Sequence, residues 1–257
     1  MCRASKPIRV MPLVAALMLA GPAGTVHAVD GVVLITQARA LEGGVTPGDE
    51  PGFPVTISEP GSYRLASDLR VTVPSAGAVL VASAHVTLDL NGFTIFGMHN
   101  AGFGIAYRND GDNMTVVKNG TIRDVNADGI YLDAFATVSD VVTALNGGSG
   151  MVAGPYGLIT NCKAIGNRGG GFYVTRSIIS NSQAGHNEGR IEPESGIVAS
   201  ESLVLDSRID GNQVYGLVAG RYTGYRGNYL ANNRLGDLRS GQRIPLGPNS
   251  CSHVLCR

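Results

Sequence analysis

Apolar and polar side chains alternate along most of the chain, in short stretches that repeat about every 21 residues. Each unit alternates for a few residues, turns and alternates again, which is the period-two signature of β-strands, and no helical stripe of period 3.6 lies within the repeat. The apolar positions form three columns. They are Ile130, Met151, Phe172, Ile197 and Leu217; then Leu132, Ala153, Val174, Ala199 and Ala219; then Val138, Ile159, Ile179 and Val204.

Glycine and asparagine recur at the same interval. The glycine column is Gly129, Gly150, Gly171, Gly196 and Gly216, and the asparagine column is Asn126, Asn146, Asn167, Asn187, Asn212 and Asn232. Polar residues at Asp140, Asn161, Asn181 and Asp206 follow the third apolar column. We expect asparagines at equivalent turns to stack and to hydrogen-bond from unit to unit. Both residue types tolerate left-handed backbone, so turn geometry explains the two columns.

A unit of three short strands cannot bury its apolar side alone, but it can do so when stacked on its neighbours. The sequence therefore predicts an all-β solenoid of parallel strands. About eight coils, stacked at ~4.8 Å each, would give a rod roughly 40 Å long. A leucine-rich repeat is the rival repeat fold, and it fails because its L-x-x-L-x-L pattern is replaced here by CKAIG, SQAGH and SRIDG.

Three further stretches resemble a known group of proteins. VTLDLNGFTI at 86–95 and KNGTIRDVN at 118–126 are similar to early coils of the pectin-lyase-like superfamily, and GGVTPGDEPGFPVTISEPGSYRL at 43–65 resembles the entry region of a bacterial exported subgroup. The resemblance covers roughly residues 55 to 235. It implies a single-stranded right-handed parallel β-helix.

The two ends of the chain differ from the repeat. Residues 1–28 combine basic residues, an apolar run and Val26-His27-Ala28, a small-residue cleavage pattern, so we interpret them as a secretory signal peptide. We expect an entry and cap segment at 29–55, with a short amphipathic helix within 35–44, the β-helix at 56–235 and a cap or tail at 236–257. The protein is then exported, to the periplasm or the medium.

The net charge limits the kinds of partner that are expected, and the cysteines indicate one disulfide. Without residues 1–28 the chain holds 17 basic and 20 acidic residues, a formal charge of −3, which argues against nucleic acid as a partner. No later segment suggests membrane insertion, and we expect a monomer. Cys251 and Cys256 are expected to form a disulfide in the tail, and Cys162 is expected to be a buried apolar residue.

One insertion concentrates charge in a weakly charged chain. The stretch HNEGRIEPES at 186–195 supplies the candidate catalytic residues His186, Glu188, Arg190, Glu192 and Glu194. A carboxylate or imidazole could move a proton at a glycosidic bond, and the guanidinium could neutralise a uronate. The alternative is a solvated charged loop.

Two other groups are weaker candidates. Asp110 and Asp112 could offer oxygen ligands to calcium, although an ordinary turn is the preferred explanation and no other cofactor is indicated. Tyrosines near the C-terminal coils could form a carbohydrate-binding platform or could pack beneath the terminal cap. They are Tyr215, Tyr222, Tyr225 and Tyr229.

Known catalytic motifs of the superfamily are missing. The chain has no tryptophan, no R-x-P-x-x-R run and no D-P-H run, and Gly185-His186-Asn187 and Arg190-Ile191-Glu192 only partly match the polygalacturonase motifs. The sequence therefore leaves open whether the protein is an enzyme, either a lyase or a glycoside hydrolase. The expected function is to bind a polysaccharide and, if the protein is an enzyme, to cleave it. The alternative is a non-catalytic structural or adhesive protein of the envelope or surface.

Overall fold

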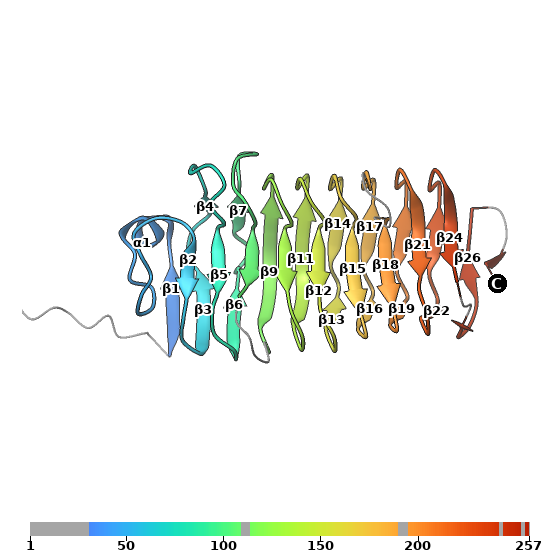
Figure 1. Ribbon diagram of the computed structural model, residues 1–257, viewed down its shortest axis with the longest axis horizontal. Coiled ribbons are helices and arrows are strands. Elements are labelled where there is room, and N and C mark those ends of the chain that lie inside the picture. The colour runs from blue at the N-terminus through green and yellow to red at the C-terminus, as the bar shows by residue number, and fades with distance from the viewer. Residues whose placement is uncertain (1–30, 109–113, 190–194, 242–243, 253–254, 257) are drawn as a thin grey trace, which may run out of the picture.

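The chain winds into a right-handed parallel β-helix, as the sequence predicts (Figure 1). The structure is a computed structural model that describes residues 31–108, 114–189, 195–241, 244–252 and 255–256. The expected signal peptide, 1–28, lies outside the described residues. No described helix is long and apolar enough to cross a membrane.

Nine coils, one more than expected, each place one strand in a nine-stranded parallel sheet. Its strands are β2 (Val55–Ile57), β5 (Val79–Val81), β8 (Ile105–Tyr107), β10 (Ile130–Leu132), β12 (Met151–Ala153), β15 (Phe172–Thr175), β18 (Ile197–Ser200), β21 (Tyr215–Ala219) and β24 (Gly236–Ser240). We call this the front sheet. It runs along the whole rod, and its strands stand side by side in Figure 1.

An eighteen-stranded second sheet holds the other two strand positions of each coil. We call the strands at the earlier of these positions the first file and those at the later position the second file. The first file comprises β1 (Val32–Ile35), β3 (Gly61–Leu65), β6 (Val86–Asp89), β13 (Leu158–Thr160), β16 (Ile178–Ser180), β19 (Leu203–Leu205), β22 (Gly224–Arg226) and β25 (Ile244–Pro245). The second file comprises β4 (Leu69–Arg70), β7 (Thr94–Phe96), β14 (Lys163–Ile165), β17 (Gln183–Gly185), β20 (Arg208–Asp210), β23 (Tyr229–Ala231) and β26 (Asn249–Ser250). Two long strands, β9 (Val116–Arg123) and β11 (Thr137–Ala144), pass through both files. β27 (Leu255–Cys256) pairs antiparallel with β26 and ends the sheet.

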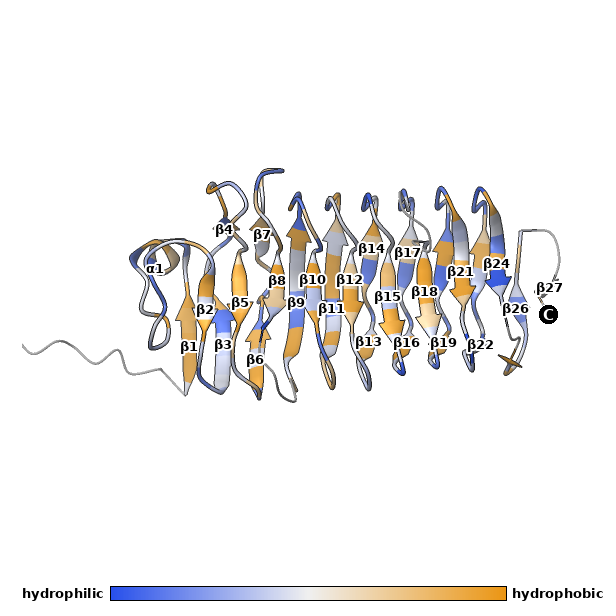
Figure 2. Ribbon diagram, viewed as in Figure 1, coloured by the Kyte–Doolittle hydropathy of each residue, from blue (hydrophilic) through white to orange (hydrophobic). Residues whose placement is uncertain are grey.

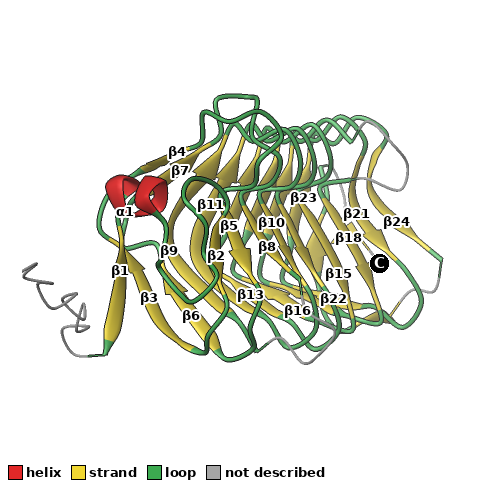
Figure 3. Ribbon diagram, turned by 60° about the vertical axis from the view of Figure 1, so that its left-hand side comes forward, coloured by secondary structure: helices red, strands yellow, loops and turns green. Residues whose placement is uncertain are grey.

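The three apolar columns form the core, as predicted. Ile130 pairs with Met151, Met151 with Phe172, and Phe172 with Ile197, so residues of one column lie in register in successive coils. All members of the three columns are buried. Figure 2 shows the apolar residues spread along the front sheet, and Figure 3 shows the strands wrapping round a common interior.

The glycine column exists for a reason that the sequence analysis did not give. None of its five glycines has a positive φ, so left-handed backbone is not what requires them. A Cβ added at Gly150 would lie 2.6 Å from Thr143 Oγ1 and 2.7 Å from both Ala164 Cβ and the carbonyl oxygen of Gly171. The coils approach too closely here for any side chain.

The asparagine column forms a hydrogen-bonded ladder in the interior, with two corrections to its membership. Each Nδ2 donates to the Oδ1 of the next asparagine at 2.8–3.1 Å. The members are Asn146, Asn167, Asn187, Asn212 and Asn233. Asn232 is the neighbour of the true member, and Asn126 is exposed. Buried Val125 stands at the start of the ladder, where its N–H donates to Asn146 Oδ1 at 3.2 Å.

Left-handed backbone lies at the three corners of the coil, at residues with φ between 45° and 67°. The corner between the front sheet and the first file holds His85, Met114, Phe135, Tyr156, Arg176, Glu201 and Tyr222. The corner between the two files holds Asn91, Asn119, Asp140, Asn161, Asn181, Asp206 and Gly227. The corner that returns to the front sheet holds His99, Asp124, Leu145, Gly166, His186, Gly211 and Asn232. Such a turn suits asparagine, aspartate and glycine, which explains the polar markers at residues 140 to 206.

The helix expected at the N-terminal end of the rod is present. It is α1 (Gln37–Glu42), which lies beside β1 and β2 (Figure 1). Thr36 caps it by accepting a hydrogen bond from the N–H of Arg39, and Ala40 is buried in the core. Parallel pairing begins at β1 and continues to β26.

Candidate functional site

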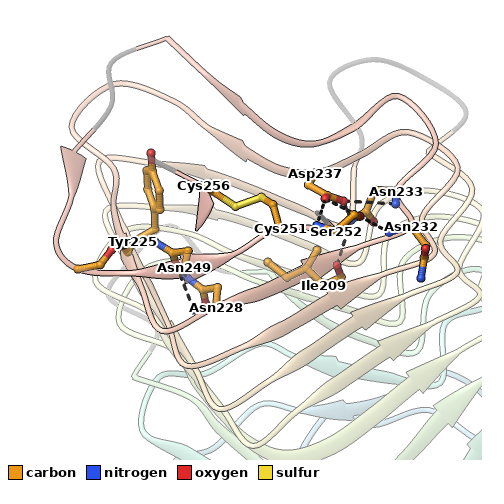
Figure 4. The surroundings of a disulfide bond; sticks show 11 residues. Ile209, Tyr225, Asn228, Asn232, Asn233, Asp237, Asn249, Cys251, Ser252 and Cys256 are labelled. Atoms are coloured by element: carbon orange, nitrogen blue, oxygen red, sulfur yellow. Dashed lines mark hydrogen bonds between the residues drawn. A yellow bond between two sulfur atoms is a disulfide. The ribbon is translucent and has the colours of Figure 1, made fainter. Parts of the chain in front are cut away.

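The expected disulfide joins Cys251 to Cys256 at the C-terminal end (Figure 4). Both cysteines are partly buried against the core. Beside them, Asp237 ends the asparagine ladder: its Oδ1 accepts from Asn233 Nδ2 at 2.9 Å, and its Oδ2 accepts from Ser252 N and Oγ at 2.8 and 2.7 Å. Burial would raise the pKa of this carboxyl, but these hydrogen bonds outweigh it and lower the pKa. Asp237 is therefore an ionised link between the ladder and the disulfide-bearing tail.

Cys162 is buried, as expected, and is not a nucleophile. Burial raises the pKa of its thiol to about 12, so the thiolate that would react is not formed near neutral pH. The Cys162 N–H donates to Ser182 Oγ at 3.2 Å, in a second column of buried polar residues that continues through Ser207 to Asn228. Its role is to pack this corner of the coil.

The charged loop is only partly within the described residues. Arg190, Glu192 and Glu194 lie outside them. His186 is a corner residue with φ 55°, and its imidazole lies where a side chain at Gly211 of the next coil would stand. Glu188 is half-buried, and its N–H donates to the carbonyl oxygen of Asn167 at 2.8 Å. The proposed catalytic roles of the five residues therefore remain predictions.

The four candidate tyrosines do not form one platform. Tyr225 is fully buried, so it offers no face to a ligand. Tyr215 belongs to the front sheet and contacts Arg239, Tyr222 lies at a corner, and Tyr229 lies on the second file beneath the guanidinium of Arg208 at 5.2 Å. These rings are spread over different faces of the rod.

The calcium candidates Asp110 and Asp112 lie outside the described residues. Among the described residues, no group of three or more histidine, cysteine, aspartate or glutamate side chains is placed to hold a metal ion.

A solvent-facing apolar column on the front sheet is the feature that sequence reasoning missed. From β10 to β21, the residue between the two buried columns of each strand points outward, and these positions were expected to be polar. They are instead Tyr131, Val152, Tyr173, Val198 and Val218, joined in register. Tyr131 and Tyr173 are 49% and 42% exposed. We call Tyr131, Val152 and Tyr173 the tyrosine lane. The sequence contained enough information to find this lane, because each of its residues stands between the two buried apolar columns of its strand.

An aromatic pair borders the tyrosine lane at the adjoining corner. Phe135 and Tyr156 occupy the same corner position in successive coils, and their rings stack with centroids 5.1 Å apart. Both are exposed, Tyr156 to 62%. Asp133 lies between the tyrosine lane and this pair, two residues after Tyr131, and is also exposed. The surface thus combines flat aromatic rings with a carboxylate.

Two carboxylates flank Tyr131, but they do not form a glycosidase pair. Asp128 and Asp133 are five residues apart along one extended stretch, a separation on the order of 15 Å, whereas inverting glycosidases use roughly 6.5–9.5 Å. Burial raises the pKa of Asp128, partly opposed by the hydrogen bond that Asp128 Oδ1 accepts from Ser149 N. Asp128 is thus bound to the next coil and is not paired with Asp133.

A histidine–aspartate pair was also missed by the sequence analysis. His99 Nε2 lies 3.2 Å from Oδ1 of Asp124, which is buried, and Arg123 Nε donates to the other carboxylate oxygen. His99 and Asp124 stand 25 residues apart at the same corner position, so they meet as neighbours in successive coils. His99 is 68% exposed, and the hollow next to it is small, lined also by Asn126 and Arg168. The pair holds two coils together.

Comparison with known proteins agrees with the fold. No family model and no curated protein matches the sequence. Among solved structures, the A-module of the mannuronan C-5 epimerase AlgE4 of Azotobacter vinelandii matches with TM-score 0.55 and 15% identity, over 80% of this chain and 68% of that one. Pectate lyase Pel9A matches with TM-score 0.55 and 13% identity, over 86% of this chain and 76% of that one. The AlgE6 A-module gives TM-score 0.50 and 14% identity, over 81% of this chain and 68% of that one. At these identities the likeness establishes the shared parallel β-helix fold.

Proposed function

We propose that this protein is an exported binder of an extended polysaccharide, which it holds along the tyrosine lane. The observation that carries the proposal is the outward column of the front sheet. The fold requires apolar residues inside the coil, but nothing in the fold requires two exposed tyrosines in register on its outer surface. Polar residues would be expected at these positions if they only faced solvent.

The geometry fits a sugar chain parallel to the rod. Tyr131 and Tyr173 stand two coils apart, so their Cα atoms are separated by roughly 10 Å. That distance is comparable to a disaccharide repeat in an extended glycan. Aromatic rings offer a large, rigid, flat surface on which the apolar face of a sugar ring can stack. Val152 between them leaves room for the intervening sugar, and Asp133 can accept hydrogen bonds from hydroxyl groups.

The structural neighbours are consistent with this class of ligand. Two of them are named as a mannuronan epimerase and a pectate lyase, both proteins that act on polysaccharides. A disulfide in this chain agrees with an exported protein, since disulfides persist in oxidising compartments. If the protein also cleaves the polysaccharide, the catalytic residues we propose are those of the 186–194 loop.

The test is a binding panel of neutral and acidic polysaccharides, with and without calcium, in which bound fraction, reducing ends and unsaturated products are measured together. We expect at least one polysaccharide to bind wild-type protein. The double variant Tyr131→Ala/Tyr173→Ala should then bind about 10–100 times more weakly, because each stacked ring contributes on the order of 1 kcal/mol.

Tyr222→Gly is the matched control, since it removes a tyrosine that is even more exposed, at a corner outside the tyrosine lane, and keeps the positive φ. It should bind like wild type. Equal affinity of wild type and the double variant for every polysaccharide that binds would refute the proposed site. Release of product by wild type would show an enzyme and would direct mutagenesis to His186 and Glu188.

A further inference from the structure

A groove lies on another side of the rod, at the corner between the two files of the second sheet. It has a volume of about 340 Å³ and is open to solvent. Three successive coils line it with equivalent pairs of side chains: Asn161 and Lys163, then Asn181 and Gln183, then Asp206 and Arg208. We call these six residues the corner groove. It spans two coil steps, roughly 10 Å.

The polar groups in the floor of the corner groove already have hydrogen-bond partners, whereas most side chains on its rims do not. The floor is the buried column in which Cys162 N donates to Ser182 Oγ and Ser182 N donates to Ser207 Oγ, both at 3.2 Å. On the rims, the side chains of Asn161, Lys163, Asn181 and Gln183 have no hydrogen-bond or ionic partner among the described residues. Arg208, by contrast, is held by Asp210 at 3.0 Å and lies over the Tyr229 ring.

Backbone geometry explains only one of the two rims. Asn161, Asn181 and Asp206 occupy left-handed corner positions, where asparagine and aspartate are favoured for the turn alone. Lys163, Gln183 and Arg208 are outward residues of strands, and no backbone requirement selects them. In the coil immediately before the groove, the same pair of positions holds Asp140 and Val142, so the long polar side chains of the second rim begin where the hollow begins.

The lining chemistry indicates a hydroxyl-rich ligand. Pockets for compact apolar molecules are lined mainly by apolar and aromatic side chains, whereas Cys162 in the floor is the one apolar residue among those that line this groove. Each of its three amides presents donors and an acceptor side by side, which match the adjacent hydroxyl groups of a sugar. Arg208 is paired with Asp210, so Lys163 is the cation of the lining that has no ionic partner among the described residues, and it can contact neutral or acidic sugars.

We infer that the corner groove is a second glycan site, and that one chain of this protein bridges two polysaccharide strands. The inference rests on the proposed function, since the tyrosine lane supplies the other site. β12 leads through β13 into β14, and β15 leads through β16 into β17, so the tyrosine lane and the corner groove share these two coils and face away from the common core on different sheets. Two strands lying parallel to the rod can therefore be held at the same time.

The test titrates four full-length proteins with a short oligosaccharide of a glycan that wild type binds, by calorimetry, and with the long polymer, by light scattering. They are wild type, the lane variant Tyr131→Ala/Tyr173→Ala, the groove variant Asn181→Gly/Gln183→Ala, and the control Asp140→Gly/Val142→Ala. The control alters the equivalent positions outside the corner groove, and glycine keeps each left-handed corner unstrained.

Wild type and control should bind two oligosaccharides per chain and should cross-link the polymer, with a rise in scattering. The lane and groove variants should each bind one oligosaccharide and should not cross-link. One oligosaccharide per wild-type chain, with binding unchanged in the groove variant, would overturn the second site and leave the proposed function standing. Binding lost in the groove variant but unchanged in the lane variant would overturn the proposed function instead.

Discussion

Replacement of Asn187 by alanine should destabilise the protein by about 3–5 kcal/mol, in denaturant unfolding followed by circular dichroism. Asn187 is fully buried, and its Oδ1 accepts from the backbone N and the Nδ2 of Asn167 at 3.0 and 3.1 Å. Its Nδ2 donates to the carbonyl oxygen of Ala164 and to Asn212 Oδ1, both at 3.0 Å. Alanine leaves several of these groups buried without a partner, at roughly 1–3 kcal/mol each before relaxation.

Asn126→Ala is the control, because Asn126 belongs to the sequence column but not to the ladder. It is exposed, so the change should stay within about 0.5 kcal/mol. Similar losses for the two variants would show that the ladder does not have the membership described above. A loss below about 1 kcal/mol for Asn187→Ala would show that its hydrogen bonds are replaced by water.

Gly150→Ala should destabilise the protein by about 3 kcal/mol, at the upper end of the usual cost of overpacking. The added methyl group would meet Thr143 Oγ1, Ala164 Cβ and the Gly171 carbonyl oxygen at 2.6–2.7 Å. The Gly171 carbonyl oxygen accepts a backbone hydrogen bond from the N–H of Met151 in the front sheet, so it cannot move away freely. Chemical denaturation measures the loss directly.

Gly185→Ala is the matched control in the next coil. Gly185 has no positive φ, and the nearest atom to an added Cβ there is the Asp210 carbonyl oxygen at 3.5 Å, an ordinary contact. Alanine should be neutral or should stabilise the protein by up to ~1 kcal/mol, because it restricts the unfolded chain. A tolerated Gly150→Ala would mean that the coils can separate locally, contrary to the close approach described above.

The fold could be predicted from the sequence because period-two alternation and a constant coil length act on every unit. Ile130, Met151 and Phe172 come into register once the coils are aligned, and a solenoid has no other way to bury them. The explanation of the glycines was wrong because spacing shows where a small residue recurs but not whether φ or a close contact requires it. The asparagine ladder shifted by one residue at each end because Val125 and Asn233, and not Asn126 and Asn232, occupy the inward position.

The binding surfaces were harder to predict, since each one is made from single residues of several coils. Tyr131 and Tyr173 are 42 residues apart in the chain and two coils apart in the rod. Asp206 joins Asn181 at the corner groove only once the longer coil between them is aligned. The charged stretch at 186–195 stood out by composition, yet its described histidine is a corner residue. Composition finds unusual segments, whereas a site on a solenoid depends on which residues share an outward column.

The most direct test of the central claim is hydroxyl-radical footprinting of the wild-type protein, with and without a polysaccharide that it binds. Oxidation of each tyrosine is read by mass spectrometry of its peptide. A glycan lying on the tyrosine lane should protect Tyr131 and Tyr173 together and leave Tyr222 unchanged, since Tyr222 is more exposed than either and lies outside the lane. Unchanged oxidation of Tyr131 and Tyr173 at saturating polysaccharide would contradict the account.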